Sequence, residues 1–173
     1  MRNDALEHDF DRLLAANGPA LARLARSYTN TVSDRDDLLQ EIALAAWQAL
    51  RRFRGECSER TFLFRIAHNR AIAHLARTRS QFAESGVDVD VRDPGPDPES
   101  ELSQEQRANR LRRAVQRLPV PYREVITLAL EDLDYAEMAA VLGTSESNVG
   151  ARLTRARRML RESLEETEMT EKK

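Results

Sequence analysis

The sequence predicts an all-α fold in which two helical domains are joined by a flexible acidic linker. Alanine, leucine, arginine and glutamate dominate both ends of the chain, and these side chains lose little on entering a helix. Alternating runs of β-branched residues, which are typical of strands, are few. The charge changes sign along the chain: residues 1–80 carry net +3, residues 81–106 hold 8 acids against one arginine, and residues 107–173 carry net +2. We interpret these segments as domain, linker and domain.

Prolines mark the linker. Residues 93–98 contain three prolines and a glycine, which exclude a regular helix there. Two roles fit the excess of acids in residues 81–106. The one we favour is a solvated tether that repels itself, and the other is an acidic strap that competes with nucleic acid for the basic faces.

Length and composition exclude several classes of protein. The 173 residues carry a net charge of −2, with no apolar run near the roughly 20 residues of a membrane-spanning helix and no apolar centre of a signal peptide. We therefore expect a cytoplasmic protein without a membrane partner. Cys57 is the only cysteine, which excludes an internal disulfide and a cysteine-rich zinc site. His68 and His74 are six residues apart, on different faces of a helix, so we expect surface or groove-lining histidines and neither a metal nor a cofactor.

Four helices are expected in the first domain, near residues 4–16, 19–30, 34–53 and 59–80. Pro19 suits the first turn of the second helix, and Ser33 is the expected cap of the third, with Asp36 in the capping-box position. Gly55 separates the third helix from the fourth. The apolar stripe of helix 34–53 is expected at Leu38, Ile42, Ala45 or Ala46, and Ala49 or Leu50, and that of helix 59–80 at Phe62, Ile66 and Ala73.

Four more helices are expected in the second domain, near residues 99–117, 121–131, 135–142 and 146–166. Asp134 with Glu137 three residues later begins a short helix, Gly143 ends it, and Ser145 caps the next one. Two helices joined by a short glycine-containing turn form a helix-turn-helix. Its expected interior is Ala136, Ala139, Ala140, Val141 and Leu142 from the first helix, and Val149, Leu153, Ala156, Leu160 and Leu164 from the second.

A helix-turn-helix places its second helix in the major groove of DNA. Asn148 has the chemistry to pair with adenine, and Glu146 to accept a hydrogen bond from cytosine. The arginines that follow suit phosphates. An ordinary amphipathic helix with a solvated basic face is the alternative, but the agreement of caps, turn and stripe favours DNA binding. The residues expected at DNA are Ser145, Glu146, Ser147, Asn148, Arg152, Arg155, Arg157 and Arg158, with Arg161 as a further basic residue.

Two sets of motifs resemble one known family. Residues 118–119, 122–126, 133–143 and several positions in 149–157 resemble conserved region four of bacterial sigma factors. Residues 34–41, 53–56 and 61–71 resemble region two. Both sets occur in the right order, joined by a linker with no middle domain, as in the small extracytoplasmic-function group of sigma-70-type factors. The resemblance covers nearly all of the chain between about residue 6 and residue 165.

The resemblance implies a protein that binds core RNA polymerase, reads the minus-ten and minus-thirty-five promoter elements, and helps to open the duplex. The implied partners are promoter DNA and the polymerase, at the clamp helices of its largest subunit and at its flap region; an anti-sigma factor is left open. Acids at a helix start are favoured by the helix dipole and suit a basic partner. The residues implied at the clamp helices are Asp36, Asp37, Gln40 and Glu41. Trp47, two turns beyond Gln40, belongs to the core or the interface, and we favour the core.

The segment from residue 53 to residue 79 resembles the unit of the family that opens the promoter and reads its minus-ten element. Single-stranded bases are held by aromatic platforms, by a pocket for a flipped base and by arginines on the backbone. Residues 54–59 are implied as the pocket wall. Phe62 stands where the family commonly has tryptophan, and core packing is the alternative for Phe62 and for Phe64. The implied minus-ten set is Arg54, Thr61, Phe62, Arg65, Asn69, Arg70, His74 and Arg77.

Two positions depart from the family pattern. Gly150 and Ala151 stand where many members have a basic residue and serine, so close approach of the backbone to DNA and a wider tolerance of sequence both stay open.

Two other functions compete with that of a sigma factor: a stand-alone helix-turn-helix regulator, and a decoy that occupies an anti-sigma factor. An enzyme has the least support, because the sequence has no glycine-rich phosphate loop, no nucleophile with a base and no metal-ligand spacing.

Overall fold

Helices make up the computed structural model, which describes residues 2–85 and 102–171. In order they are α1 (Arg2–Arg26), α2 (Val32–Leu50), α3 (Glu59–Ser85), α4 (Leu102–Arg117), α5 (Val120–Ala129), α6 (Tyr135–Leu142) and α7 (Glu146–Glu171). These described residues include no strand, which confirms the predicted all-α class. None of the helices in these ranges is long and apolar enough to cross a membrane.

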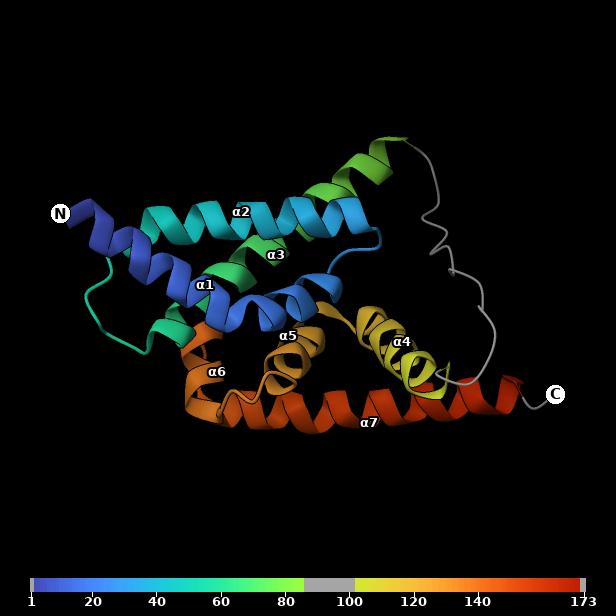
Figure 1. The fold of residues 1–173 in the computed structure, drawn as a ribbon. Coiled ribbons are helices and arrows are strands. Elements are labelled where there is room, and N and C mark those ends of the chain that lie inside the picture. Colours follow the sequence, from blue (N-terminus) through green and yellow to red (C-terminus); the bar gives the residue numbers. More distant parts are fainter. Residues whose placement is uncertain (1, 86–101, 172–173) are drawn as a thin grey trace.

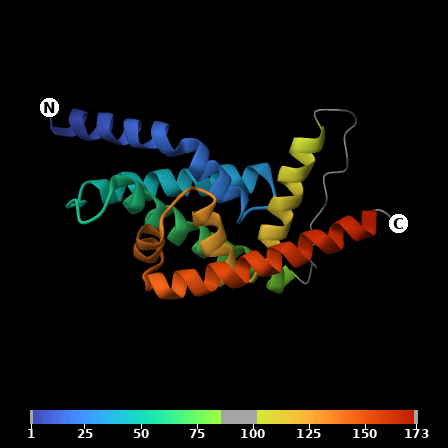
Figure 2. The same ribbon diagram turned by 90° about the horizontal axis from the view of Figure 1, so that it is seen from below.

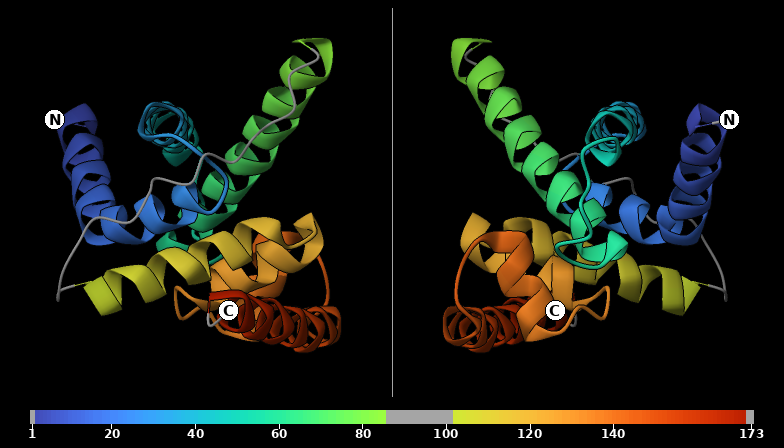
Figure 3. Two further views of the ribbon diagram at one scale, coloured as in Figure 1. Left: turned by 90° about the vertical axis from the view of Figure 1, so that its right-hand side faces the viewer. Right: turned by 90° about the vertical axis from the view of Figure 1, so that its left-hand side faces the viewer.

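Helix α1 corrects the prediction of two separate helices near residues 4–16 and 19–30. Pro19 lies inside one continuous helix. The side-chain amide of Asn17 donates to the Leu13 carbonyl at 2.9 Å, so this buried polar group is paired within the helix. The helix continues because apolar residues on both sides of Pro19, such as Leu13 and Leu24, are buried. Figure 3 shows α1 changing direction along its length, as expected of a helix with an internal proline.

Helix α2 begins earlier than predicted because its cap is Thr31 and not Ser33. Thr31 has an extended backbone, and its hydroxyl oxygen accepts a hydrogen bond from the amide of Asp34 at 3.1 Å. The helix ends at Leu50, short of the predicted residue 53. Its buried residues match the predicted stripe and are Leu38, Ile42, Ala45 and Ala46.

Helix α3 extends beyond the predicted end at residue 80, and its apolar stripe was predicted wrongly. The buried residues are Leu63, Phe64, Ala67 and Ala71, whereas Phe62 and Ile66 are half-buried and Ala73 is exposed. Tertiary contacts decide which side chains of α3 are buried, because the helix packs against α1, α2 and α6 on different sides. His68 is buried among them, contrary to the expectation of a surface or groove-lining histidine.

The linker boundaries differ from the prediction. Residues 81–85 belong to α3 and residues 102–106 to α4, so both ends of the predicted linker 81–106 are helical. Residues 86–101 lie outside the described residues, so neither role considered for the linker, the favoured tether or the acidic strap, is tested. Helix α5 ends at Ala129 and not at residue 131, and α7 runs past residue 166 to Glu171.

The helix-turn-helix forms as predicted. Asp134 and Glu137 make both hydrogen bonds of a capping box, and Gly143 ends α6 in the left-handed conformation at φ 63°. The Ser145 hydroxyl accepts from the amide of Asn148 at 3.2 Å at the start of α7. Ala136 is exposed, contrary to prediction, and Met138 is buried instead. A residue two positions after the cap faces outward here because α6 packs through the face that carries Met138.

The two halves of the chain pack against each other. Figure 1 shows α1, α2 and α3 together on one side, with α5 and α6 between them and α7. Helix α7 contacts α4, α5 and α6 along its length, and Figure 2 shows the same elements from below. Buried apolar residues from both halves form one cluster. The direct contact between α3 and α6 decides which candidate site residues are open to solvent.

Candidate polymerase and nucleic-acid interfaces

The start of α2 presents an acidic surface. Asp36, Asp37 and Gln40 are exposed, and Asp36 pairs with its neighbour Arg35 at 2.9 Å. Leu44, one turn beyond Gln40, is 59% exposed, which is unusual for leucine on a packed helix. Leu44 was not predicted to belong to this surface. Its spacing of seven residues from Asp37 and four from Gln40 places all three on one face of α2.

Glu41 belongs to a contact within the first half. Its carboxylate accepts a hydrogen bond from the Arg77 guanidinium at 2.5 Å, which joins α2 to α3. The same hydrogen bond raises the pKa of Arg77. The two residues were predicted in different interfaces, Glu41 at the polymerase and Arg77 at the minus-ten element. Here each is the partner of the other.

A groove lies between the second half of α2 and the start of α3. Its volume is about 840 Å³, and we call it the α2–α3 groove. The Phe62 ring packs on Phe53 with 4.4 Å between centroids, and the Arg51 guanidinium lies 5.4 Å from the centroid of Trp47. Trp47 also packs edge-on against Phe10, so it is part of the packing and part of the groove wall. The groove is lined by Leu44, Ala45, Trp47, Gln48, Ala49, Arg51, Arg52, Phe62 and Arg70.

Two of these groove residues, Phe62 and Arg70, were predicted as minus-ten residues, whereas the wall formed by α2 was not predicted. A tryptophan followed within five residues by two arginines was the signal that could have found it. Phe64 is fully buried and belongs to the core, which was the alternative stated for it. Aromatic faces flanked by arginines suit unpaired bases and their phosphates.

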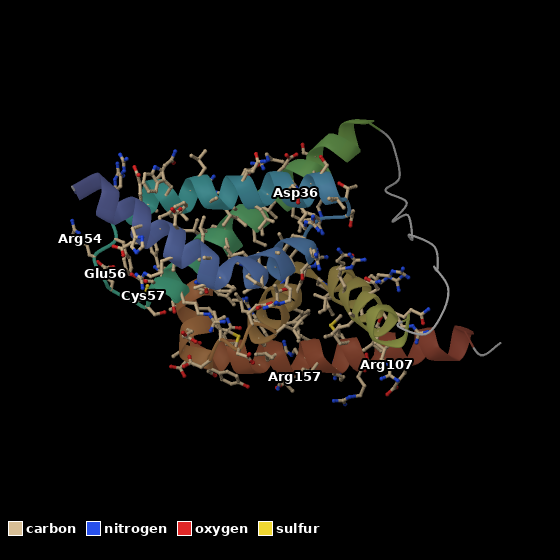
Figure 4. The ribbon with its side chains drawn as sticks, in the orientation of Figure 1. Asp36, Arg54, Glu56, Cys57, Arg107 and Arg157 are labelled. Carbon is tan, nitrogen blue, oxygen red and sulfur yellow. The ribbon has the colours of Figure 1, made fainter. Side chains whose placement is uncertain are left out.

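The loop before α3 lies at the end of the first half opposite the acidic surface. Gly55 has φ 74°, a left-handed conformation that favours glycine. Figure 4 shows Arg54 and Glu56 on this loop, at the other end of α2 from Asp36. Of the other predicted minus-ten residues, Asn69 and Arg70 are exposed and His74 is half-buried.

Two predicted minus-ten residues are covered by the second half of the chain. Thr61 is 3% exposed; its hydroxyl lies 2.8 Å from that of Ser58 and donates to the Glu137 carboxylate at 3.4 Å. The Arg65 side chain donates to the carbonyl of Ala140 at 3.1 Å. Glu137 and Ala140 both belong to α6. In this arrangement α6 occupies the face of α3 that carries these two residues.

A buried carboxylate ties the two halves together at the turn after α5. Glu131 is 4% exposed and accepts two hydrogen bonds from Arg23 of α1, at 2.8 and 2.6 Å. This bond raises the pKa of Arg23. Arg60 of α3 donates to the Glu131 carbonyl. We call Arg23, Arg60 and Glu131 the Glu131 clasp.

Further contacts between the halves surround His68. Its Nε2 lies 3.5 Å from the Glu124 carboxylate of α5, which in turn lies 3.8 Å from Arg152 of α7. Burial lowers the pKa of His68 to about 4 and raises that of Glu124. His68 is therefore neutral at pH 7. Arg152, predicted at DNA, is half-buried and faces Glu124 instead of solvent.

The remaining predicted residues of the helix-turn-helix lie open on α7. Exposed side chains occupy its first turn and continue on the same side as arginines. Asn148 donates from its side-chain amide to the Thr144 hydroxyl at 2.9 Å, an exposed contact that orients it. Figure 4 shows Arg157 on the side of α7 away from α5 and α6. The exposed members of the predicted set are Ser145, Glu146, Ser147, Asn148, Arg155, Arg157 and Arg158.

Comparison with known proteins identifies the family. The model for sigma-70 region 2 matches residues 13–81, and the model for sigma-70 region 4 matches residues 108–160. The RNA polymerase sigma factor NccH of Alcaligenes xylosoxydans xylosoxydans is 32% identical, over 94% of this chain and 90% of NccH. The chain belongs to the extracytoplasmic-function group of the sigma-70 family. This sigma factor is also 30% identical to the sigma-E factor of Escherichia coli, over 86% of this chain and 82% of that one.

Solved structures agree with this assignment. CnrH, in complex with the cytosolic domain of CnrY, is 31% identical with a TM-score of 0.67, over 92% of this chain and 89% of CnrH. RpoE of Bartonella quintana, in complex with the anti-sigma factor NepR, has a TM-score of 0.74 over 91% of this chain and 97% of RpoE; at 23% identity it shows the fold alone. The chain is a sigma factor that directs promoter-specific transcription initiation by RNA polymerase. Matches to both regions disfavour the stand-alone regulator and the decoy.

Proposed function

We propose that region 2 of this sigma factor uses two separate surfaces, one for core polymerase and one for the minus-ten DNA. The observation that carries the proposal is their separation: the acidic start of α2 lies at one end, and the Arg54 loop with the aromatic wall of the α2–α3 groove lies toward the other. A protein that holds polymerase and DNA at once needs such a separation. The chain acts by binding and positioning, with no catalytic step of its own.

The polymerase surface is formed by Asp36, Asp37 and Gln40, and Leu44 lies at its edge, where the α2–α3 groove begins. Their partner is the pair of clamp helices in the largest subunit, and region 4 contacts the flap region. Exposed acids steer a basic partner, while an exposed leucine supplies the apolar contact that charges alone lack. Glu41 supports this surface through its ion pair with Arg77.

The α2–α3 groove receives unpaired bases of the opened promoter. Phe62, supported from behind by Phe53, offers a stacking face, and stacking on an aromatic side chain contributes about 1–3 kcal/mol per base. Arg51, Arg52 and Arg70 line the same groove and suit the phosphates. Residues 54–59 form the wall of a pocket for a flipped base.

Region 4 reads the minus-thirty-five element with the first turn of α7. The exposed side chains of Glu146, Ser147 and Asn148 meet base edges, and Arg155, Arg157 and Arg158 meet phosphates. This surface faces solvent while the two regions are packed together. The face of α3 that carries Thr61 and Arg65 is covered by α6. Region 4 therefore separates from α3 before these two residues reach DNA.

An anti-sigma factor is a further partner in this proposal. Its support is the related CnrH, which was solved with the cytosolic domain of CnrY and aligns over 92% of this chain. Such a partner is expected to bind the packed arrangement and to keep α3 covered.

The test is run-off transcription with purified core polymerase and a library of promoters. We expect transcripts from a limited subset of the library that shares two sequence elements, because two DNA-reading surfaces act together. Transcription indistinguishable from that of core polymerase alone would contradict the proposal. A subset with only one shared element would contradict the role given to one of the two surfaces.

A further inference from the structure

His68 is a buried histidine at the boundary between regions 2 and 4. It lies on α3 and is 7% exposed, with its neighbours Ala67 and Ala71 in the core. Its Nε2 atom faces region 4, where the Glu124 carboxylate of α5 lies 3.5 Å away. That distance is at the outer limit of a hydrogen bond, so the imidazole has exchanged water for a weak polar contact. Separation of the two regions returns water to this atom.

The acid beside His68 already faces a cation. Glu124 also lies 3.8 Å from the Arg152 guanidinium of α7, and its side chain is largely buried. Arg123 of α5 adds a further cation, whose guanidinium lies 5.7 Å from the ring centroid of Tyr28 of α1. Tyr28 is buried, and burial raises its pKa, so it supplies no negative charge. A proton on His68 therefore places a second cation on one buried carboxylate.

The other helices around α3 place their acids elsewhere. The buried side chains of α2 are apolar, and its Glu41 pairs with an arginine nine residues beyond His68. Helix α6 brings Glu137 to Thr61, seven residues before His68. On α3 itself, Arg65 donates to a backbone carbonyl of α6. These contacts leave burial as the dominant influence on the imidazole.

The two arrangements of the chain therefore bind a proton at His68 with different affinity. Burial lowers the pKa of His68 from 6.5 to about 4 while the regions are packed, whereas an imidazole in water keeps the ordinary value. The packed arrangement thus loses stability relative to the open one as the pH falls through 6.5 toward 4. Glu124 acts in the opposite direction, because burial raises its pKa and the packed chain takes up that proton more readily. Its effect belongs to the more acidic end of this range, since its ordinary value is 4.5.

We infer that protonation of His68 releases region 4 from α3, so that acidification opens the chain. The inference rests on the proposed separation of region 4 from α3 during promoter binding. It adds a cause of that separation that needs neither polymerase nor DNA. Between pH 7.5 and 5.5, the ratio of open to packed chains rises about tenfold, because the open form binds a proton that the packed form excludes.

The experiment measures opening of the full chain at pH 7.5, 6.5 and 5.5. Anisotropy of a fluorescent single-stranded minus-ten oligonucleotide, taken from a transcribed promoter of the library, reports the accessible face of α3, and small-angle scattering reports the radius of gyration. His68→Gln keeps a polar side chain but cannot take up the proton. The ratio of wild-type to His68→Gln affinity should rise by up to about tenfold between pH 7.5 and 5.5, with a larger wild-type radius of gyration. His8→Gln changes an exposed histidine on α1 and is the matched control, which should respond as wild type does.

Nuclear magnetic resonance of the histidine ring protons tests the same inference without a change at position 68. The chain has three histidines, so His8→Gln and His74→Gln assign the other two signals. The His68 signal of the wild type should titrate well below pH 6.5, and Arg23→Ala, which weakens the Glu131 clasp, should move its midpoint up toward that value. A wild-type midpoint at 6.5 would show that packing does not oppose protonation, and the inference would be wrong.

The binding data separate this inference from the proposed function. If the ratio of wild-type to His68→Gln affinity does not change with pH, His68 is not coupled to packing, and the inference is wrong while the proposed function stands. If the ratio falls in acid, protonated His68 strengthens its pair with Glu124, and the inference has the wrong sign. Equal binding of a scrambled oligonucleotide at every pH would instead overturn the proposed role of region 2. Thermal melting at pH 7.5 checks that His68→Gln keeps its fold, and the ring-proton titration decides the question if it does not.

Discussion

Phe62 belongs both to the side-chain packing and to the surface that we propose for base stacking. Its ring rests on Phe53 and lines the α2–α3 groove beside Arg70. An aromatic residue in this position retains the stacking face that the usual tryptophan of the family provides. Because Phe62 is only half-buried, its removal affects the groove more than the core.

Phe62→Ala is expected to lower the rate of open-complex formation on a duplex promoter by about tenfold or more, because one stacking contact to an unpaired base is lost. Phe62→Trp should keep most of the activity, since it keeps a larger stacking face. Permanganate reactivity of unpaired thymines measures the opening. A template already unpaired over the bubble should partly restore Phe62→Ala. Equal opening by Phe62→Ala and wild type would remove Phe62 from the site.

Exposure of single residues was only partly predictable from sequence. Asn69 and Arg70 are exposed, as a DNA-reading role requires, but Thr61 and Arg65 are covered by residues 76 and 75 positions further along the chain. No local pattern contains that information. Leu44 and the α2 wall of the groove were missed for a different reason, since an apolar or aromatic residue on an amphipathic helix is most often part of the core.

At the scale of elements, the local signals of the second domain proved reliable, whereas the predicted Ser33 cap and the predicted helix start at Pro19 in the first domain were wrong. The capping box at Asp134, the left-handed Gly143 and the Ser145 cap are all contained within a few residues, and the helices they bound form as predicted. Helix α1 instead continues through Pro19 because residues beyond the proline are buried against other helices. The stripe of α3 depends on α6, which follows some fifty residues later in the sequence.

Helix α2 acts as a unit in the proposed polymerase contact, and reversal of its charge tests that role. The double variant of Asp37→Arg and Gln40→Arg is expected to weaken binding to core polymerase about tenfold or more, because a basic helix then faces a basic partner. Both side chains are exposed, so helicity should not change. Glu56→Arg is the matched control at the other end of region 2 and should assemble normally. Wild-type affinity of the double variant would contradict the assignment.

For the whole molecule, the decisive feature is that regions 2 and 4 share one core and one buried ion pair. Glu131 is nearly inaccessible to water, so its carboxylate needs Arg23 while the regions are packed. When they separate, water solvates both groups. Removing one partner of a buried ion pair destabilises the folded arrangement by up to about 3–5 kcal/mol. Because Arg23 is half-exposed, this ion pair lies at the lower end of that range. A modest shift of this kind is enough to change the balance between packed and open chains.

Arg23→Ala is therefore expected to open the chain, because the packed arrangement then leaves the Glu131 carboxylate buried without a counterion. Small-angle scattering of the free protein should give a larger radius of gyration, and a single-stranded minus-ten oligonucleotide should bind several-fold more tightly, since Thr61 and Arg65 become accessible. Arg12→Ala is the matched control: it removes an exposed ion pair with Glu59, at 3.3 Å, that joins α1 to α3 within region 2. This control should change neither measurement. A radius of gyration for Arg23→Ala equal to that of wild type, together with unchanged oligonucleotide binding, would show that the Arg23–Glu131 ion pair does not hold the two regions together, and the covering of α3 would then have to rest on the contacts of Arg60, His68 and α6.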